Sequence, residues 1–501
     1  MFKKNKIASS VAIGILGALG IIASAQAVHL NSDGTGQVLL FPYFNAQQGY
    51  VTNINLVNSS DDTKAVKIRF HEGKSSQDIL DFNIYLSPED VWTGSIKPAT
   101  DTKGNKIGAL TTGDRTCTMP SLASCDDGRC EATIPFNGHD VYQNLTAADT
   151  REGFVEVIEM GVVTDASVKA GVVHKNGKPV DCKTVTKAWD SGAFTQGVGA
   201  AAKGLAAPTG SLFGSSAILN IAEGTAFALA PVAIDEYSTQ AQHYRPDDPD
   251  KFLLPSLASG NVTTSSVVVK KPTGESELVV TDWKQITDAC LSDGDNLTPA
   301  CGTNPYPMAH VLLAPSLMNE YFLDPTLGYD GHTDWVVSFP MKKYGINTAD
   351  AQISTYFDKG LYDRNAGLAN TSKAGFPTST GTPSVYGALA RHVNVLTFKS
   401  TDPSYDLSRT VLSSTAQQDL SVGPFVSGWG RLAFPAYSLA SGFKSAQAYG
   451  ATPDVYSADS TIYQGVPVAG AAFVEGNVSE NTHARFGDAF PHKIQRNYLA
   501  Q

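Results

Sequence analysis

The hydrophobic and polar positions of this chain alternate in short runs that predict β-strands. The clearest alternation runs from Ala65 to His71, where Val66, Ile68 and Phe70 share one face and basic side chains occupy the other. Clusters of Asn, Ser, Asp and Gly separate such runs and are typical of turns. Further strands are predicted at 37–44, 50–57, 81–86, 153–160, 215–222, 267–270, 277–283, 333–340, 392–398, 428–435 and 466–474.

Strands of this length and spacing predict a mainly β fold. We expect two or three antiparallel β-sandwich (immunoglobulin-like) units with long loops and few short helices. Helices are predicted only in parts of 309–319 and at 387–391. The predicted domains are a β-sandwich with a cysteine-bearing loop at 28–190, a Gly/Ala/Ser-rich and then acidic connecting region at 191–250, and a second β-rich domain at 251–501.

The first 27 residues have the pattern of a secretory signal peptide. Three lysines precede an apolar run at 11–23, and Ala25-Gln26-Ala27 supplies the small residues of a cleavage site. The apolar run is shorter than the ~20 residues that span a bilayer, so a membrane anchor is the weaker interpretation. We therefore predict an exported protein, located in the periplasm, on the cell surface or outside the cell, with no transmembrane segment after cleavage.

Cysteine usage fits an oxidising compartment. The chain has an even number of cysteines, and we expect structural disulfides among Cys117, Cys125, Cys130, Cys182, Cys290 and Cys301. Cys290 and Cys301 flank one polar loop and are expected to bond to each other. One of the three cysteines at 117–130 is expected to reach Cys182. Zinc ligation is disfavoured, because neither CxxC pairs nor neighbouring histidines accompany these cysteines.

Composition and charge narrow the functional class. The chain has 501 residues, 42% of them hydrophobic and 17% charged, and its net charge is −11. This hydrophobic content excludes a disordered chain, and the evenly spread acidic charge argues against nucleic-acid binding. An outer-membrane barrel is a rival class, because its strands are individually weak signals. The six cysteines and 26 prolines argue against it.

Calcium is the one cofactor that the sequence suggests. Asp and Asn cluster on a Gly-bearing turn in the Cys290–Cys301 loop, and oxygen ligands of this kind suit a hard cation. The same residues are ordinary turn formers, so a plain turn is the main alternative. The candidate ligands are Asp288, Asp293, Asp295 and Asn296, and Asp247, Asp248 and Asp250 form a weaker candidate.

Catalytic signatures are sparse. The nucleophile elbow G-x-S-x-G, H-E-x-x-H and the P-loop are all absent from the sequence. Two groups remain candidates: His332 beside Asp330 and Asp334, and His483 near Arg485 and Asp488. Solvated turns are the alternative for both groups. Five tryptophans could stack on sugars if they were exposed, but most adjoin strand patterns and are expected in the core.

Several blocks resemble an uncharacterised family of exported, β-rich proteins of Gram-negative bacteria. These blocks are Gly36–Asn45, Asn55–Asn58, Val66–Phe70, Tyr85–Trp92, Asp334–Pro340, Gly465–Gly470 and Phe490–His492. The resemblance implies export and a β-rich fold, and it implies no activity, ligand or catalytic residue.

These observations together favour an exported non-enzymatic structural, adhesive or cell-surface protein that needs no cofactor. Its partners would be further copies of itself or another surface component, with strands added at sheet edges as one mode of contact. An enzyme is the less favoured class. The alternatives are a secreted carbohydrate-active or other hydrolase and a calcium-dependent ligand-binding module.

Overall fold

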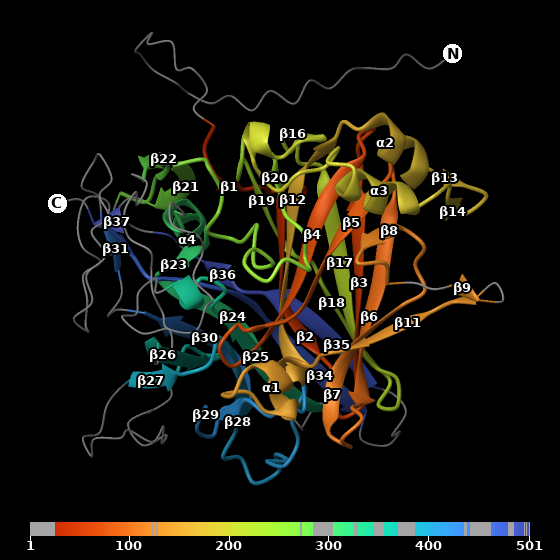
Figure 1. Ribbon diagram of the computed structural model, residues 1–501. Helices are drawn as coiled ribbons and strands as arrows, with labels where there is room; N and C mark the ends of the chain where they lie inside the picture. Colours follow the sequence, from red (N-terminus) through yellow and green to blue (C-terminus); the bar gives the residue numbers. More distant parts are fainter. Residues whose placement is uncertain are drawn as a thin grey trace, which may run out of the picture.

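The computed structural model shows a mainly β protein, which confirms the predicted fold class (Figure 1). It describes residues 26–122, 125–126, 129–270, 273–283, 304–324, 329–344, 355–368, 386–434, 438–440, 462–478, 485–494, 496 and 498–499. The first and second sheets are built from strands of the N-terminal half, and the third and fourth sheets from strands of the C-terminal half.

The first and second sheets are made of separate strands, and several of the long ones follow the predicted runs closely. The first sheet has the strand order β1 (His29–Leu30), β19 (Val232–Asp235), β2 (Val38–Asn45), β12 (Glu152–Val163), β4 (Lys64–Glu72), β5 (Asp78–Leu86) and β8 (Cys117–Met119), with β16 (Leu205–Ala206) beside β12. The second sheet has the order β11 (Ala132–Pro135), β7 (Lys106–Thr112), β6 (Val91–Thr100), β3 (Tyr50–Asn58), β17 (Leu212–Asn220) and β18 (Thr225–Leu229).

The third and fourth sheets are built in the same way. The third sheet has the order β29 (Gln417–Ser421), β28 (Val393–Lys399), β25 (Tyr329–Ser338), β34 (Ala469–Val478) and β35 (Arg485–Pro491). The fourth has the order β27 (Tyr386–Leu389), β26 (Thr355–Asp363), β30 (Ser427–Ala433), β24 (Ser316–Phe322) and β36 (Lys493–Ile494).

Short pairs and helices complete the described chain. The pairs are β9 (Cys125–Asp126) with β10 (Arg129–Cys130), β13 (His174–Lys175) with β14 (Lys178–Pro179), β15 (Gly197–Val198) with β20 (Gln242–His243), β21 (Thr264–Lys270) with β22 (Ser276–Asp282), β23 (Leu313–Ala314) with β33 (Val466–Pro467), and β31 (Ser438–Ala440) with β32 (Ile462–Gln464) and β37 (Tyr498–Leu499). The helices are α1 (Gly138–Val141), α2 (Ala166–Val172), α3 (Lys183–Asp190) and α4 (Tyr306–Leu312), with 3₁₀ turns at Ala147–Arg151, Gly199–Ala201 and Lys342–Tyr344.

The alternation of side chains along the strands shows how the four large sheets of the described residues are stacked. On β2, Leu39 and Phe41 lie in the core between the first and second sheets, whereas Leu40 lies in the core between the first and third. On β25, Val336 joins that same middle core and Trp335 lies in the core between the third and fourth sheets. The stacking order is therefore second, first, third, fourth. Each large apolar side chain that is fully buried contributes roughly 1.5–3 kcal/mol.

The stretch 191–250, for which the sequence predicts a connecting region, contributes strands to these sheets. Its strand β17 pairs with β3 from Leu212 opposite Asn58 to Asn220 opposite Tyr50. Its strand β19 lies between β1 and β2 in the first sheet. The two halves also share one core, because side chains of both halves meet between the first and third sheets.

The helix predictions were only partly right. Helix α4 overlaps the start of the predicted segment 309–319, but the chain is already in strand β24 at Ser316. The predicted helix at 387–391 is wrong, because Gly387–Leu389 belongs to β27 and pairs with β26. Helices α2 and α3, which lie together at the top of Figure 1, were not predicted. Among the described residues, no helix is long and apolar enough to cross a membrane.

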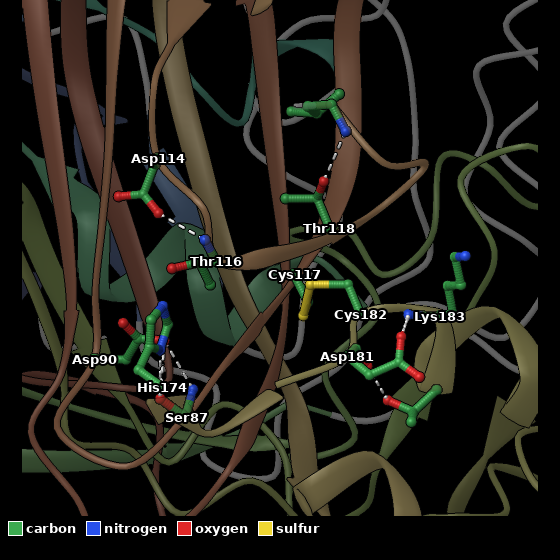
Figure 2. Close-up of a disulfide and its surroundings, with 12 residues drawn as sticks. Ser87, Asp90, Asp114, Thr116, Cys117, Thr118, His174, Asp181, Cys182 and Lys183 are labelled. Atoms are coloured by element: carbon green, nitrogen blue, oxygen red, sulfur yellow. Dashed lines mark hydrogen bonds and ion pairs between the residues drawn. A yellow bond between two sulfur atoms is a disulfide. The ribbon is translucent and has the colours of Figure 1, made fainter. Parts of the chain in front are cut away.

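A disulfide between Cys117 and Cys182 fastens this helical segment to the first sheet. Cys117 begins the edge strand β8, and Cys182 immediately precedes α3 (Figure 2). Trp189 of α3 packs on the same side, and its Nε1 donates to the hydroxyl of Tyr85 at 3.2 Å. The prediction that a cysteine of the 117–130 loop reaches Cys182 is thus confirmed. Cys125 and Cys130 are backbone register partners in the β9–β10 pair, and Cys290 and Cys301 lie outside the described residues.

Candidate functional site

A polar pocket of about 660 Å³ lies where loops of the two halves meet. The N-terminal half contributes two turns, because Tyr50 and Asn220 are register partners at the ends of β3 and β17. The C-terminal half contributes the loop between β28 and β29 and three side chains of the third sheet. The lining residues are Gln48, Tyr50, Asn220, Glu223, Ser408, Arg409, Thr410, Val411, Ser413, Ser414, Gln417, Glu475 and Arg485.

Buried polar groups of the C-terminal half hold the β28–β29 loop in place. Lys399, at the end of β28, donates from its ammonium group to the carbonyls of Leu407 and Arg409. Asp334 of β25 accepts from the backbone N–H of Leu412 at 2.8 Å. Burial raises the pKa of Asp334 to about 6, because the charged carboxylate is removed from water. The loop thus has a fixed course over the third sheet.

The N-terminal half holds the same loop from the other side. The Tyr50 hydroxyl donates to the carbonyl of Val411, and the Asn45 amide donates to the carbonyl of Leu412 at 2.8 Å. Burial, together with the nearby charge of Glu475, raises the pKa of Tyr50 well above its ordinary value. The tyrosine therefore stays protonated and remains a hydrogen-bond donor at neutral pH.

Glu152 of β12 is the centre of this junction. Its carboxylate accepts from the Ser414 hydroxyl at 2.6 Å and from the Thr415 backbone N–H at 3.0 Å, both in the loop. It also accepts from the Tyr43 hydroxyl at 3.0 Å and from the Gln47 amide at 2.8 Å, both in its own half. Hydrogen bonds to a charged acceptor are stronger than neutral ones. Glu152 therefore ties the two halves together inside the protein.

A chain of titratable side chains runs along the third sheet to the pocket. His332 and Glu475 are register partners on β25 and β34. His332 Nε2 lies 3.1 Å from Asp330, and Arg409 lies 3.7 Å from Asp330 through its Nη1. Arg409 also pairs with Glu475, and Arg485 pairs with Glu223 and lies 4.0 Å from Glu475. In order, the chain is His332, Asp330, Arg409, Glu475, Arg485 and Glu223.

The buried members of this chain have shifted protonation equilibria. Burial lowers the pKa of His332, although Asp330 opposes that shift, and the imidazole Nδ1 lies 3.1 Å from the hydroxyl of Tyr405. Burial raises the pKa of Glu475, and the Arg409 guanidinium opposes this shift. Perturbed groups that converge on a pocket are a general sign of a functional site, although structural ion-pair networks produce the same sign.

The two predicted histidine groups have different outcomes. His332 is 1% exposed in strand β25 and pairs with Asp330, so it does not lie in a solvated turn. Asp334 faces the loop and not His332. His483 lies outside the described residues, but Arg485 takes part in the pocket. Arg409, Glu475 and Glu223 were missed, because no local motif marks charges that converge from separate strands and turns.

The two groups of calcium candidates differ in whether the structure describes them. Asp288, Asp293, Asp295 and Asn296 lie outside the described residues. Of the weaker candidates, Asp247 accepts two hydrogen bonds from Arg245, at 2.8 and 2.7 Å. Asp248 accepts from Gln196 at 2.6 Å. Within the described part of the chain, no group of three His, Cys, Asp or Glu side chains is arranged to hold a metal ion.

One Ser, His and Asp cluster lies beside the disulfide (Figure 2). The Ser87 hydroxyl lies 3.1 Å from Asp90 Oδ2 and 3.2 Å from His174 Nδ1, and the same Nδ1 lies 3.5 Å from Asp90. A catalytic triad needs the serine and the carboxylate on opposite ring nitrogens. Here both contact Nδ1, so the cluster closes the predicted turn at 87–90 and does not have the geometry of a triad.

A second charged cluster lies on the face of β4 that carries Lys67 and Arg69. Lys67 lies 2.5 Å from Asp81. Arg69 pairs with Glu156 on β12 and, at 2.9 Å, with Asp78 on β5. The Arg69 guanidinium also donates to the carbonyls of Phe252 and Pro255 at 3.0 and 3.1 Å. Lys67 also donates to the carbonyl of Phe252 at 3.4 Å, so these buried basic side chains dock the segment that follows residue 251 onto the first sheet.

The tryptophans lie mostly in the cores, as expected. Trp92, Trp283 and Trp335 are almost fully buried, and Trp189 is 8% exposed. Trp429 is the exception, with 40% exposure, and its ring stacks on Tyr362 with centroids 4.6 Å apart.

No family model matches the chain, and no curated protein or solved structure shows significant similarity to it.

Proposed function

We propose that this chain is an exported, non-enzymatic structural, adhesive or cell-surface protein. The observation that carries the proposal is the junction around Glu152, where buried hydrogen bonds from both halves converge on one carboxylate. With the shared core between the first and third sheets, this junction favours a single rigid block of stacked sheets. The charged side chains in the pocket pair with one another across strands and turns, which is an arrangement that holds sheets together.

Export is supported by the disulfide between Cys117 and Cys182, because such bonds persist outside the cytoplasm. The signal-peptide pattern and the resemblance to exported β-rich proteins point in the same direction. Periplasmic and surface locations both fit these features. Further copies of the chain, or another envelope component, are the partners that a rigid and acidic surface protein of this kind would contact.

Fractionation of the native cell tests this proposal. We expect the protein in the periplasmic or outer-envelope fraction, with a mass that corresponds to cleavage after Ala27 and with its disulfide oxidised. Protease treatment of intact cells then separates the two locations, since only a surface protein would be digested. A protein found reduced, with an intact N-terminus and in the cytoplasm, would overturn the proposal.

A further inference from the structure

The pocket between the two halves has a lining that is balanced in charge. Its wall carries two arginines and two glutamates, and Arg409 pairs with Glu475 while Arg485 pairs with Glu223. Each guanidinium is therefore neutralised within the wall itself. Neither an anion nor a cation would find an uncompensated charge on these side chains, so net charge gives a ligand little advantage here.

Uncharged polar side chains of the lining remain available to a ligand. Among the described residues, Gln48, Thr410, Ser413 and Gln417 line the pocket, and their side chains make no hydrogen bond within the chain. Amides and hydroxyls each offer both a donor and an acceptor. Thr410 and Ser413 are half-buried in the wall, while Gln48 and Gln417 are exposed at its rim. The available groups thus suit a partner that also donates and accepts at many points.

The pocket is already held in its shape. The β28–β29 loop is fixed by Asp334 from the third sheet, and by Tyr50, Asn45 and Glu152 from the N-terminal half. A preformed wall lowers the entropy that a ligand must lose on binding. The volume of about 660 Å³ is that of a small-molecule site. An apolar ligand is disfavoured, because it would leave the polar wall desolvated and unpaired.

From this wall we infer that the pocket binds a neutral, polyhydroxylated ligand, which is to say a carbohydrate without acidic groups. Its hydroxyls would exchange hydrogen bonds with Gln48, Thr410, Ser413 and Gln417, and the ion pairs would form the floor. This binding role goes beyond the proposed structural function, and the failure of one leaves the other standing.

The test uses the purified, oxidised mature protein and a defined set of probes. The neutral probes are hexoses, N-acetylhexosamines and their linear oligosaccharides. The charged probes are oligosaccharides that contain uronate or sulfate groups. Binding is measured by saturation-transfer NMR and titration calorimetry, with ligand up to about 10 mM. We expect at least one neutral saccharide to bind, with a Kd that changes less than about twofold between about 50 and about 300 mM salt.

A matched pair of variants locates the site. Gln417 faces the pocket, whereas Gln418 is the register partner of Leu396, whose side chain lies in the core on the other side of the third sheet. Gln417→Trp should fill the rim and weaken binding at least about tenfold, and Gln418→Trp should leave it unchanged. Thr410→Val, which removes only hydrogen-bonding capacity, should also weaken binding.

Three outcomes would overturn the inference. One is the absence of binding by every neutral saccharide, another is binding of the charged oligosaccharides alone, and the third is unchanged affinity in both Gln417→Trp and Thr410→Val. Thermal unfolding of each variant is measured in parallel. If Gln417→Trp does not fold, Thr410→Val decides the outcome by itself.

Discussion

The bond between Cys117 and Cys182 should carry a large share of the stability of the N-terminal half. It closes a loop of 65 residues between the edge strand β8 and helix α3. In the chain-entropy description, a 15-residue loop contributes about 3 kcal/mol and a 100-residue loop about 4.7 kcal/mol, so this bond should contribute about 4 kcal/mol. We therefore expect Cys117→Ala/Cys182→Ala to lower the free energy of unfolding by about that amount.

Urea unfolding at neutral pH measures this loss. Circular dichroism follows the sheets, and tryptophan fluorescence includes the contribution of Trp189, whose indole donates to Tyr85 beside the bond. Reduction is the matched control, because it removes the bond from the wild type as well. In reductant the two proteins should differ only by the cost of replacing a buried thiol such as that of Cys117, on the order of 1 kcal/mol.

Two results would refute this reasoning. A loss below about 1 kcal/mol would mean that the bond does not constrain the unfolded chain as the loop length implies. A fluorescence transition at lower urea than the circular dichroism transition would mean that α2 and α3 detach separately. In that case the bond would stabilise the helical segment and not the first sheet.

Three further predictions concern buried groups. Glu152→Gln should destabilise the protein by about 2–3 kcal/mol, because several donors lose a charged acceptor, whereas the same change at exposed Glu131 should have little effect in urea unfolding. Burial lowers the pKa of His243 to about 3, so stability should fall as the pH drops from about 6.5 towards 3, by about 2 kcal/mol at pH 5. His243→Gln should remove that part of the acid sensitivity, and equal pH profiles for the two proteins would contradict the assignment. Trp335→Ala should cost about 3–5 kcal/mol, and Trp429→Ala, at a half-exposed ring, clearly less, as thermal unfolding would show.

The strands were predictable because their signal is local. The alternating run Ala65–His71 predicts a strand with two different faces, and the apolar run before Asn45 predicts a strand that is buried on both faces. Neither prediction depends on the rest of the chain. The two faces of β4 were correctly separated by the pattern. What lies against each face is not local information, and the basic face is as buried as the apolar one. Burial there depends on acidic partners on β5 and β12 and on the segment after residue 251.

The same limit applies to the assignment of 191–250 as a connecting region. Glycine and alanine are weak strand formers, so within this region the sequence predicts only one strand, at 215–222. Strand β17 confirms that strand and pairs with β3 along its length, whereas β19 was not predicted. Gly214 fits this setting, since a Cβ there would lie 2.6 Å from the carbonyl oxygen of Asn55. The small residue allows a close pairing that local propensity does not reveal.

The pocket shows why a candidate functional site can escape a motif search. Its charged groups come from β25, β34, β35, one turn of the second sheet and one long loop, so no pair is close in sequence except His332 and Asp330. Sequence reasoning found that pair and, separately, Arg485, but nothing in the sequence brought them together. The loop between β28 and β29 brings Arg409 to that pair only because Asp334, Tyr50 and Glu152 hold the loop from both halves. The site therefore exists only when the two halves are joined, and any change that loosens the Glu152 junction should weaken ligand binding before it unfolds the sheets.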